Sequence, residues 1–422
     1  MAVTVTLPPT SQTATSAPES GRAFRPSLFF SEFRLALLVA PLIVFVAITV
    51  LVPVALFLFR AIDNSDMHDN LPLTALALRG WSIQSGVPDS VAFAALSADL
   101  GNAVAKGSEG RLAQRINQIL PGTRTLVIKT ARLAGEGAFA TGDAKQRILD
   151  SAPGWSDPKL WAAIANDNAR FTAFYLLTSL DLEQRPDGSI GPVPAKNALF
   201  IDILGRTILI SIVVTALCVV LALPVAHVIV AAPPRIGGVL VALVLFPLWT
   251  SLLVRTVAWI ILLQGDGPVN TALIRLGAIS EPLRLVYTRS SLIVTMVQVL
   301  LPLMILPILS VLRRISRDYM RAATSLGATW WQAWRRVQLP LIMPGILTGS
   351  GIVFVFALGY YVTPALIGGP RDQMLSSFIV FYTDKTLNWG LAAALSLELL
   401  IVLLAAALAI HLLRRMFRRM PE

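Results

Sequence analysis

Two ionisable residues stand inside long apolar stretches of the sequence, where a charge is unusual. Glu398 lies within residues 391–413 and Arg255 within residues 236–263. Moving such a side chain into hydrocarbon costs about 2.5–3.5 kcal/mol, so it usually faces the interior of a helix bundle or a watery path. We interpret Glu398 as lining such a path or making a buried polar contact. For Arg255, near the end of its stretch, extending toward the membrane surface is an equal alternative.

Three further polar side chains share these apolar surroundings, namely Gln298, Tyr360 and Tyr361. A cationic ligand could be held by aromatic faces together with a carboxylate. These three residues, with Arg255 and Glu398, are therefore the candidates for lining such a path.

The other reactive residue types form no catalytic pattern in the sequence. A single cysteine, Cys218, excludes an internal disulfide and a cysteine metal cluster, and the three histidines are too far apart to make a local ligand pair. Residues 137–142 have the glycine spacing of a phosphate loop, but Asp143 stands where the phosphate-binding lysine must be. We expect no catalytic residue, no metal site and no cofactor bound by this chain.

The elements that must position the candidate residues are membrane helices. Of the 422 residues, 55% are hydrophobic and 14% are charged, against about 25% charged in an ordinary soluble protein. An apolar helix of about 20 residues crosses the hydrocarbon layer. The stretches long enough to do so are residues 35–59, 207–230, 236–263, 290–312, 341–367 and 391–413.

Two parts of the chain differ in composition from these stretches. Residues 1–34 are rich in Pro, Ser, Thr and Ala and predict a disordered cytoplasmic tail. Residues 63–196 carry 13 basic and 14 acidic residues and no stretch long enough to span. Their apolar residues recur at helical spacing, which predicts a mainly helical insert domain between the first and second spans.

Arginine placement predicts the orientation of the spans. Residues 313–340 hold six arginines against one acid, and the basic tail at 414–422 adds four more. Basic loops stay in the cytoplasm, so both termini are predicted inside and the insert domain outside. A nucleic-acid surface would place these arginines over a polar face, whereas here they flank membrane segments.

The segment 321–340, within the loop 313–340, predicts an amphipathic helix between two spans. Ala323, Leu326, Trp330, Trp334 and Val337 recur at three- and four-residue steps and form one apolar stripe. Gly327 permits a bend or a close approach, while Pro340 is expected to end the element and to push Leu339 toward an extended conformation. A helix lying on the membrane surface is the alternative.

The spacing in this segment resembles the EAA loop of ABC-importer permeases. Two alanines are followed by a glycine four positions after the second alanine, and then by an aliphatic residue and Leu-Pro. Arg321 departs from the glutamate usual in that loop. The residues that carry the resemblance are Ala322, Ala323, Gly327, Val337, Leu339 and Pro340.

The resemblance extends over residues 200–413 and is greatest to the polyamine (spermidine/putrescine) type of permease. It rests also on stretches such as Phe246 to Thr256 and Val362 to Pro370. Tyr360 stands where many of these relatives have an acid, so another small organic solute stays an alternative substrate.

What the resemblance implies is an all-α membrane protein with the six-helix type I ABC-importer permease fold. Its segment 321–340 would dock on a cytoplasmic ABC ATPase dimer, which would bind ATP and Mg. A second permease subunit, an extracytoplasmic solute-binding protein and a location in the bacterial inner membrane are implied as well. The insert domain is not part of the family pattern.

Two other functions compete with this interpretation. A membrane sensor could use residues 63–196 as an external ligand-binding domain, but it would need a cytoplasmic signalling module larger than the tail at 414–422. A secondary transporter often shows two related halves, and we find no such repeat. The importer permease therefore remains the favoured hypothesis.

Overall fold

The computed structural model describes residues 39–185 and 187–418, so the predicted tail 1–34 and the last four residues lie outside the described residues. From Phe57 onward the chain forms one compact unit. In the described residues, six helices are long and apolar enough to cross a membrane, which confirms the predicted fold class. They are Val39–Phe59, Phe200–Ala231, Leu252–Arg275, Arg289–Leu312, Trp330–Leu358 and Trp389–Leu413.

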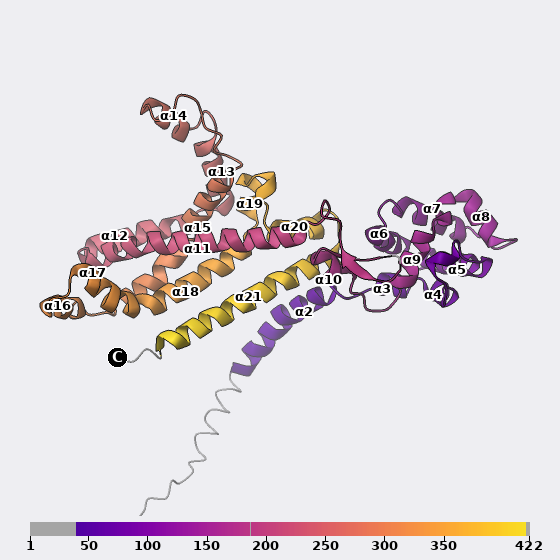
Figure 1. The fold of residues 1–422 in the computed structure, drawn as a ribbon, viewed down its shortest axis with the longest axis horizontal. Helices are drawn as coiled ribbons and strands as arrows, with labels where there is room; N and C mark the ends of the chain where they lie inside the picture. The colour runs from indigo at the N-terminus through magenta and orange to yellow at the C-terminus, as the bar shows by residue number, and fades with distance from the viewer. Residues whose placement is uncertain (1–38, 186, 419–422) are drawn as a thin grey trace, which may run out of the picture. The chain divides into compact units, whose positions relative to one another are not determined.

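Helix α15 (Arg289–Leu312) packs into a bundle with two other spans. It contacts α11 (Phe200–Ala231) and α18 (Leu339–Leu358), which also contact each other (Figure 1). More of its length is buried than in any other span described. Side chains such as Leu292, Met296 and Met304 are fully buried there, so α15 is the centre of the membrane core.

Glycine lets α18 approach α15 closely. A Cβ atom added at Gly345 would lie 3.0 Å from the carbonyl oxygen of Pro307, and one at Gly349 would lie 2.7 Å from the Met304 sulfur. Small residues four positions apart typically allow such close helix contacts in membranes.

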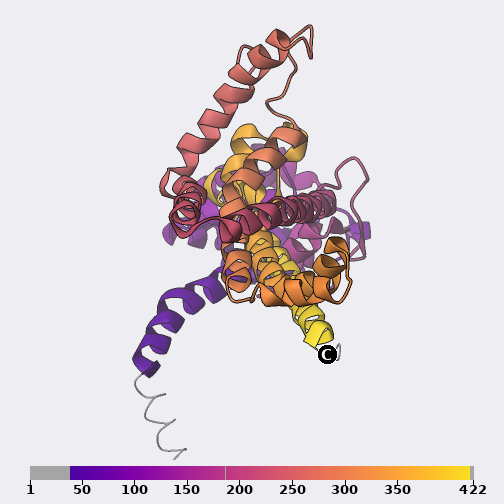
Figure 2. The ribbon, with the colours of Figure 1, turned by 90° about the vertical axis from the view of Figure 1, so that its left-hand side faces the viewer.

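The region predicted as one third span, 236–263, is divided in the structure. Helix α12 (Pro234–Leu245) runs into a 3₁₀ turn, η4 (Phe246–Trp249), and Thr250 and Ser251 then adopt extended ψ angles before α13 (Leu252–Leu263) begins. Pro247 lies in η4 and lacks the N–H that a continuing helix would use. Figure 2 shows α13, with α14 (Pro268–Arg275), extending away from the rest of the bundle.

The region predicted as the fifth span, 341–367, also has different bounds. Helix α18 ends at Leu358, and α19 (Val362–Ile367) is a separate short helix after Gly359. A 3₁₀ turn, η6 (Pro370–Asp372), and α20 (Leu375–Asp384) lead to the last helix, α21 (Trp389–Arg418).

The expectation that Pro340 ends its helix and extends Leu339 is wrong. Leu339 is helical, with φ −60° and ψ −46°, and the chain continues without a break from η5 (Trp334–Gln338), a π-helical turn, into α18. A π turn relieves the clash between a proline ring and the carbonyl four residues before it. The same arrangement occurs at Pro53 in α2 (Val52–Phe59), which follows the π turn η1 (Ala47–Leu51).

The insert predicted at residues 63–196 is mainly helical, as expected. Its core holds fully buried aromatic residues, Phe93, Trp155 and Trp161, under short amphipathic helices. The helical elements are α3 (Ser65–His68), α4 (Pro72–Ala77), η2 (Ile83–Ser85), α5 (Ser90–Ala105), α6 (Glu109–Ile119), α7 (Arg124–Gly135), α8 (Ala144–Ser151), η3 (Pro153–Ser156), α9 (Pro158–Asn166) and α10 (Phe174–Ser179). An antiparallel hairpin of β1 (Leu182–Gln184) and β2 (Ile190–Pro192) follows, with Leu182 opposite Pro192.

A buried ion pair joins the first and last parts of the insert. Arg115 pairs with Asp167, and its Nε donates to the Asn64 side chain at 2.8 Å. Burial raises the pKa of Asp167, although the Arg115 charge acts in the opposite direction. The Arg115 guanidinium also lies 4.6 Å from the Phe174 ring and 4.7 Å from the Tyr175 ring, so the pair is tied to α10.

Helix α10 is the last helix of the insert, and it packs against the start of α21, so it connects the insert to the bundle. Tyr175 donates from its hydroxyl to Gln118 at 2.8 Å, while its ring lies so close to Gly390 that an added Cβ would be 2.3 Å away. Ala393 and Leu395 of α21 complete this small core.

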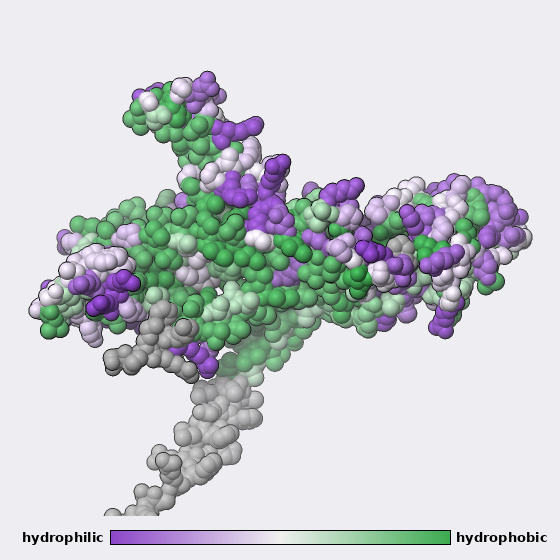
Figure 3. Space-filling model, viewed as in Figure 1, coloured by the Kyte–Doolittle hydropathy of each residue, from purple (hydrophilic) through white to green (hydrophobic). Residues whose placement is uncertain are grey.

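Figure 3 shows how polarity is distributed over the surface: apolar surface covers the bundle, and hydrophilic residues gather on the insert and near α16 and α17.

Candidate functional site

A polar cluster lies where α13, α15 and α19 meet. The hydroxyls of Thr256 and Thr363 are 3.4 Å apart, and both residues are fully buried. The Trp259 indole donates to the Gln298 amide oxygen at 3.4 Å. The structure therefore places Gln298, one of the candidate path residues, beside a buried contact between α13 and α19.

Arg255 belongs to the same cluster. Its Nη2 donates to the carbonyl of Thr250 at 3.3 Å, in the extended break before α13, while its Nε and Nη1 are buried without a hydrogen-bond partner. The Tyr360 hydroxyl is also buried, and it lies near the Thr363 side chain and near enough to Arg255 to interact electrostatically. Buried polar atoms without partners are uncommon, so these mark a site that other groups could complete.

Of the other two candidates, one lies at the edge of this cluster and one lies apart from it. Tyr361 is 44% exposed, directly before α19. Glu398 is buried on α21, and its polar neighbours are Ser179 and Asp181 of the insert. The structure brings Arg255, Gln298 and Tyr360 together and sets Glu398 at the junction of insert and bundle.

The segment 321–340 does not form the single helix that its periodicity predicts. Helix α16 (Asp318–Ser325) ends two residues before Gly327, whose φ of +86° lies in the left-handed region that glycine tolerates. Thr329 then caps α17 (Trp330–Ala333) through a reciprocal hydrogen bond with Gln332. The predicted stripe from Ala323 to Val337 is therefore split over two helical pieces, because the chain turns at Gly327.

The turn leaves large apolar side chains uncovered at the tip of this segment. Leu326 is 89% exposed and Trp330 67% exposed, whereas Ala333 is buried. Trp331 stacks on Trp334 with ring centres 5.0 Å apart. Exposed clusters of aromatic and aliphatic residues rimmed by charge typically mark protein or membrane contacts.

Two arginines near the start of this segment have different surroundings. Arg317 donates to the carbonyl of Val230, at the end of α11, at 2.8 Å. Arg321 pairs with Asp318 at 3.4 Å, and both side chains are more than three-quarters exposed. The Arg321 pair is therefore available to solvent, whereas Arg317 fastens the loop to the bundle.

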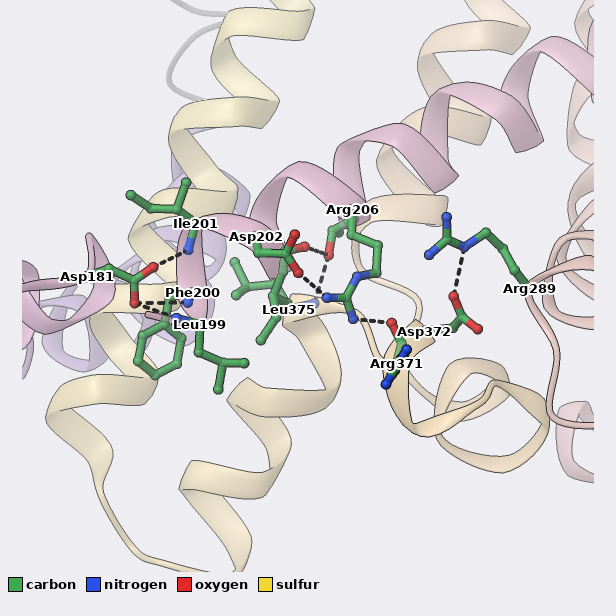
Figure 4. A network of polar contacts seen from close by, with 12 residues as sticks. Asp181, Leu199, Phe200, Ile201, Asp202, Arg206, Arg289, Arg371, Asp372 and Leu375 are labelled. Carbon is green, nitrogen blue, oxygen red and sulfur yellow. Dashed lines mark hydrogen bonds and ion pairs between the residues drawn. The ribbon is translucent and has the colours of Figure 1, made fainter. Parts of the chain in front are cut away.

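Sequence reasoning missed a polar network at the opposite ends of the helices (Figure 4). Asp181 accepts from the backbone N–H groups of Leu199, Phe200 and Ile201 at 2.8–3.1 Å and so caps α11 from the end of the insert. A carboxylate at a helix N-terminus is favourable because unpaired N–H groups and the helix dipole face it.

The second half of the network fastens the loop between α19 and α20. Arg206 on α11 pairs with Asp202 and donates to the carbonyl of Arg371. The Nε of Arg289, at the start of α15, pairs with Asp372 at 2.7 Å. Charged residues at the ends of apolar stretches were the available signal, but the partners that Arg206 and Arg289 find in residues 371–372 are 165 and 83 residues away and could not be assigned.

Within residues 39–185 and 187–418, no group of three or more His, Cys, Asp or Glu side chains is placed to hold a metal ion.

Comparison with known proteins covers the second half of the chain. Residues 218–419 match the family described as binding-protein-dependent transport system inner membrane component. The spermidine/putrescine transport system permease protein PotB of Salmonella typhimurium is 32% identical over 207 residues, which are 49% of this chain and 72% of that protein. PotB of Escherichia coli K12 is 31% identical over 49% of this chain and 75% of its own length.

Among solved structures, a bacterial alginate ABC transporter in complex with its periplasmic protein is 20% identical. The match covers 52% of this chain and 79% of that chain, with a TM-score of 0.44.

Proposed function

Because the chain belongs to the family of binding-protein-dependent transport system inner membrane components, and is a permease subunit of an ABC importer, we propose that it carries a polyamine-like solute. The observation that supports the solute is the likeness to the spermidine/putrescine permeases. The solute would be delivered by an extracytoplasmic binding protein. Another small organic solute is the second candidate, favoured by Tyr360 at a position where many of these relatives carry an acid.

The polar cluster of α13, α15 and α19 is the proposed part of the translocation path. Gln298 and Tyr360 offer hydrogen-bonding groups and an aromatic face, which a protonated amine could use. Arg255 would not bind a cation, so we assign it a positioning role on the break before α13, through its contact with Thr250. Tyr361, exposed beside the cluster, would reach the solute from the open side.

Glu398 has a different proposed role. It lies beside Ser179 of the insert and away from the cluster, so we propose that a hydrogen bond between Ser179 and Glu398 holds α21 to the insert. Glu398→Gln would then reduce assembly together with uptake. A loss of uptake alone, with assembly unchanged, would return Glu398 to the path.

The exposed tip of the segment 321–340 is the proposed docking element for a separate ATPase subunit, which would bind ATP and Mg. Leu326 and Trp330 present apolar surface that a groove on a soluble partner would cover. Arg321, Ala322 and Ala323 lie on the same side of the Gly327 turn as Leu326. The remaining residues of the proposed element, Trp334, Val337, Leu339 and Pro340, connect the tip to α18.

A second permease subunit is the proposed partner of α12–α14, of which α13 and α14 extend from the bundle (Figure 2) and which carries exposed side chains such as Val239, Leu253 and Trp249. With six spans and the arginines of 313–340 in the cytoplasm, both termini would lie inside and the insert outside.

The proposal is tested at the Gly327 turn. Gly327→Asp, with Leu326→Glu as a second variant that keeps the glycine, should abolish ATP-driven uptake and copurification of the ATPase subunit. The matched control is Gly188→Asp in the hairpin of the insert, because Gly188 also has a positive φ, +84°, and no atom within 4 Å of an added Cβ. All three variants should insert into the membrane.

Normal uptake and copurification in both tip variants would rule out docking at this segment.

Uptake of labelled spermidine and putrescine by the complete complex in proteoliposomes tests the solute. A complex that hydrolyses ATP but takes up neither amine would rule out the polyamine-like solute and leave the permease assignment intact.

A further inference from the structure

A cleft of about 890 Å³ opens between the insert and the connector that joins α20 to α21. Its walls come from α6 and the start of α7 in the insert, from residues 385–387 of the connector and from residues 389–390 at the start of α21. This volume falls in the range of small-molecule sites in proteins. Five basic side chains line the cleft: Arg60, Arg111, Arg115, Arg124 and Lys385.

The positive charge of this cleft is only partly balanced. The two acids that line it are already paired, Asp63 with Arg60 at 3.1 Å and Asp66 with Arg111 at 3.2 Å. Arg115 is engaged with Asp167.

Arg124 and Lys385 are the remaining cations. Both are exposed, and their side chains make no ion pair or hydrogen bond with the described residues. One stands on the insert and the other on the connector, so an anion between them would neutralise both walls.

The cleft lies at the level where two spans leave the membrane. Arg60 directly follows the span Val39–Phe59, and Trp389 begins the span Trp389–Leu413. Trp389 is half-exposed and packs edge-on against Phe57, with ring centres 6.3 Å apart. Tryptophan concentrates at the depth of lipid headgroups, where phosphate groups are the abundant anions.

We propose that this cleft binds the phosphate of an anionic membrane phospholipid. Arg124 and Lys385 contact the headgroup from opposite walls, and the acyl chains lie along the apolar ends of α2 and α21. The bound lipid thereby ties the insert to the connector that starts α21. This assignment depends on the chain spanning a membrane and is independent of the transported solute.

The test compares lipid binding by the full-length chain purified in detergent. Native mass spectrometry with added phosphatidylglycerol should show a retained lipid, and phosphatidylcholine, which has no net charge, should be retained less. The double variant Arg124→Gln/Lys385→Gln should weaken phosphatidylglycerol binding about fivefold for each cation removed. Arg79→Gln/Lys196→Gln is the matched control, because both residues are exposed cations outside the cleft.

Three results would overturn the proposal. The first is equal retention of phosphatidylglycerol and phosphatidylcholine. The second is equal loss of lipid in the cleft variant and the control variant. The third is binding of inorganic phosphate that fully displaces phosphatidylglycerol at equal concentration, since this would assign the cleft to a soluble anion. Because both side chains are exposed, the cleft variant should keep the wild-type thermal unfolding temperature.

Discussion

The membrane bundle and the insert domain are both helical, yet their interiors are built from different residues. The insert buries Phe93, Trp155 and Trp161 completely, and both indoles donate hydrogen bonds inside the core. The bundle instead brings α18 onto α15 through Gly345 and Gly349. The insert also uses short helices, whereas α11 runs for 32 residues.

The solvent explains this difference. In water, burying a large aromatic side chain removes much apolar surface and drives the insert to fold. In lipid the surroundings are as apolar as the side chains, so helices gain little from burial and associate by close packing of backbones. Mutations should therefore harm the insert by leaving cavities and harm the bundle by adding volume.

The largest expected effect is a cavity in the insert. Trp161→Ala removes a side chain with no exposed surface and a hydrogen bond to the Trp155 carbonyl, at 2.9 Å. Loss of such a residue costs about 3–5 kcal/mol, which is a large part of the stability of a domain of this size. Thermal unfolding of the purified chain, followed by tryptophan fluorescence, should show the insert melting first.

Trp249→Ala is the matched control, because Trp249 is 79% exposed on the bundle. It should change the unfolding temperature of the insert little. If Trp161→Ala instead abolishes membrane insertion, the insert and the bundle fold as one unit and are not stabilised separately.

A smaller effect is expected from added volume in the bundle. In Gly345→Val the new Cβ meets backbone atoms of α15 at 3.0–3.1 Å, so one helix must move. Overpacking of this kind costs about 1–3 kcal/mol. Thermal unfolding in detergent measures the loss. Gly205→Val is the control, since no atom lies within 4 Å of a Cβ at Gly205 on α11; equal losses in the two variants would argue against glycine-mediated packing.

The same contrast explains which parts of the fold the sequence predicts. Apolar stretches long enough to span are visible without knowing their partners, so residues 290–312 are predicted nearly as α15 forms. The break before α13 was missed because its residues are as apolar as those of a continuous span. It depends on Pro247 and on the extended backbone of Thr250 and Ser251.

The candidate site was predictable only in part, for a related reason. A polar residue in an apolar stretch is visible in the sequence, which identified Arg255, Gln298 and Glu398. Which of them meet depends on the packing of α13, α15 and α19, and Glu398 lies instead against Ser179 of the insert. Periodicity likewise predicted one helix over residues 321–340, whereas the positive φ of Gly327 turns the chain and exposes Leu326.

The smallest expected effect concerns a buried carboxylate in the insert, because moving a charge from water into the core of the insert is unfavourable. Asp99 on α5 is almost fully buried, and its Oδ2 accepts hydrogen bonds from the Thr74 N–H at 2.7 Å and the Thr74 hydroxyl at 2.8 Å. Burial raises the pKa of Asp99 above its ordinary 3.8, despite these hydrogen bonds, which act in the opposite direction. The folded insert therefore holds a proton on Asp99 more tightly than the unfolded chain does.

A raised carboxyl pKa means that the Asp99 contribution to stability falls as pH rises from 3.8 toward the folded-state value. Asp99→Asn keeps an oxygen acceptor for Thr74 and removes the buried charge. At pH 7 the variant should be as stable as the wild type or more so, by less than about 1 kcal/mol. Toward pH 4 the wild type should regain stability relative to the variant. Thermal unfolding between pH 4 and pH 8 measures this difference, and a wild-type advantage that grows with pH would mean that the Thr74 hydrogen bonds outweigh the cost of burial.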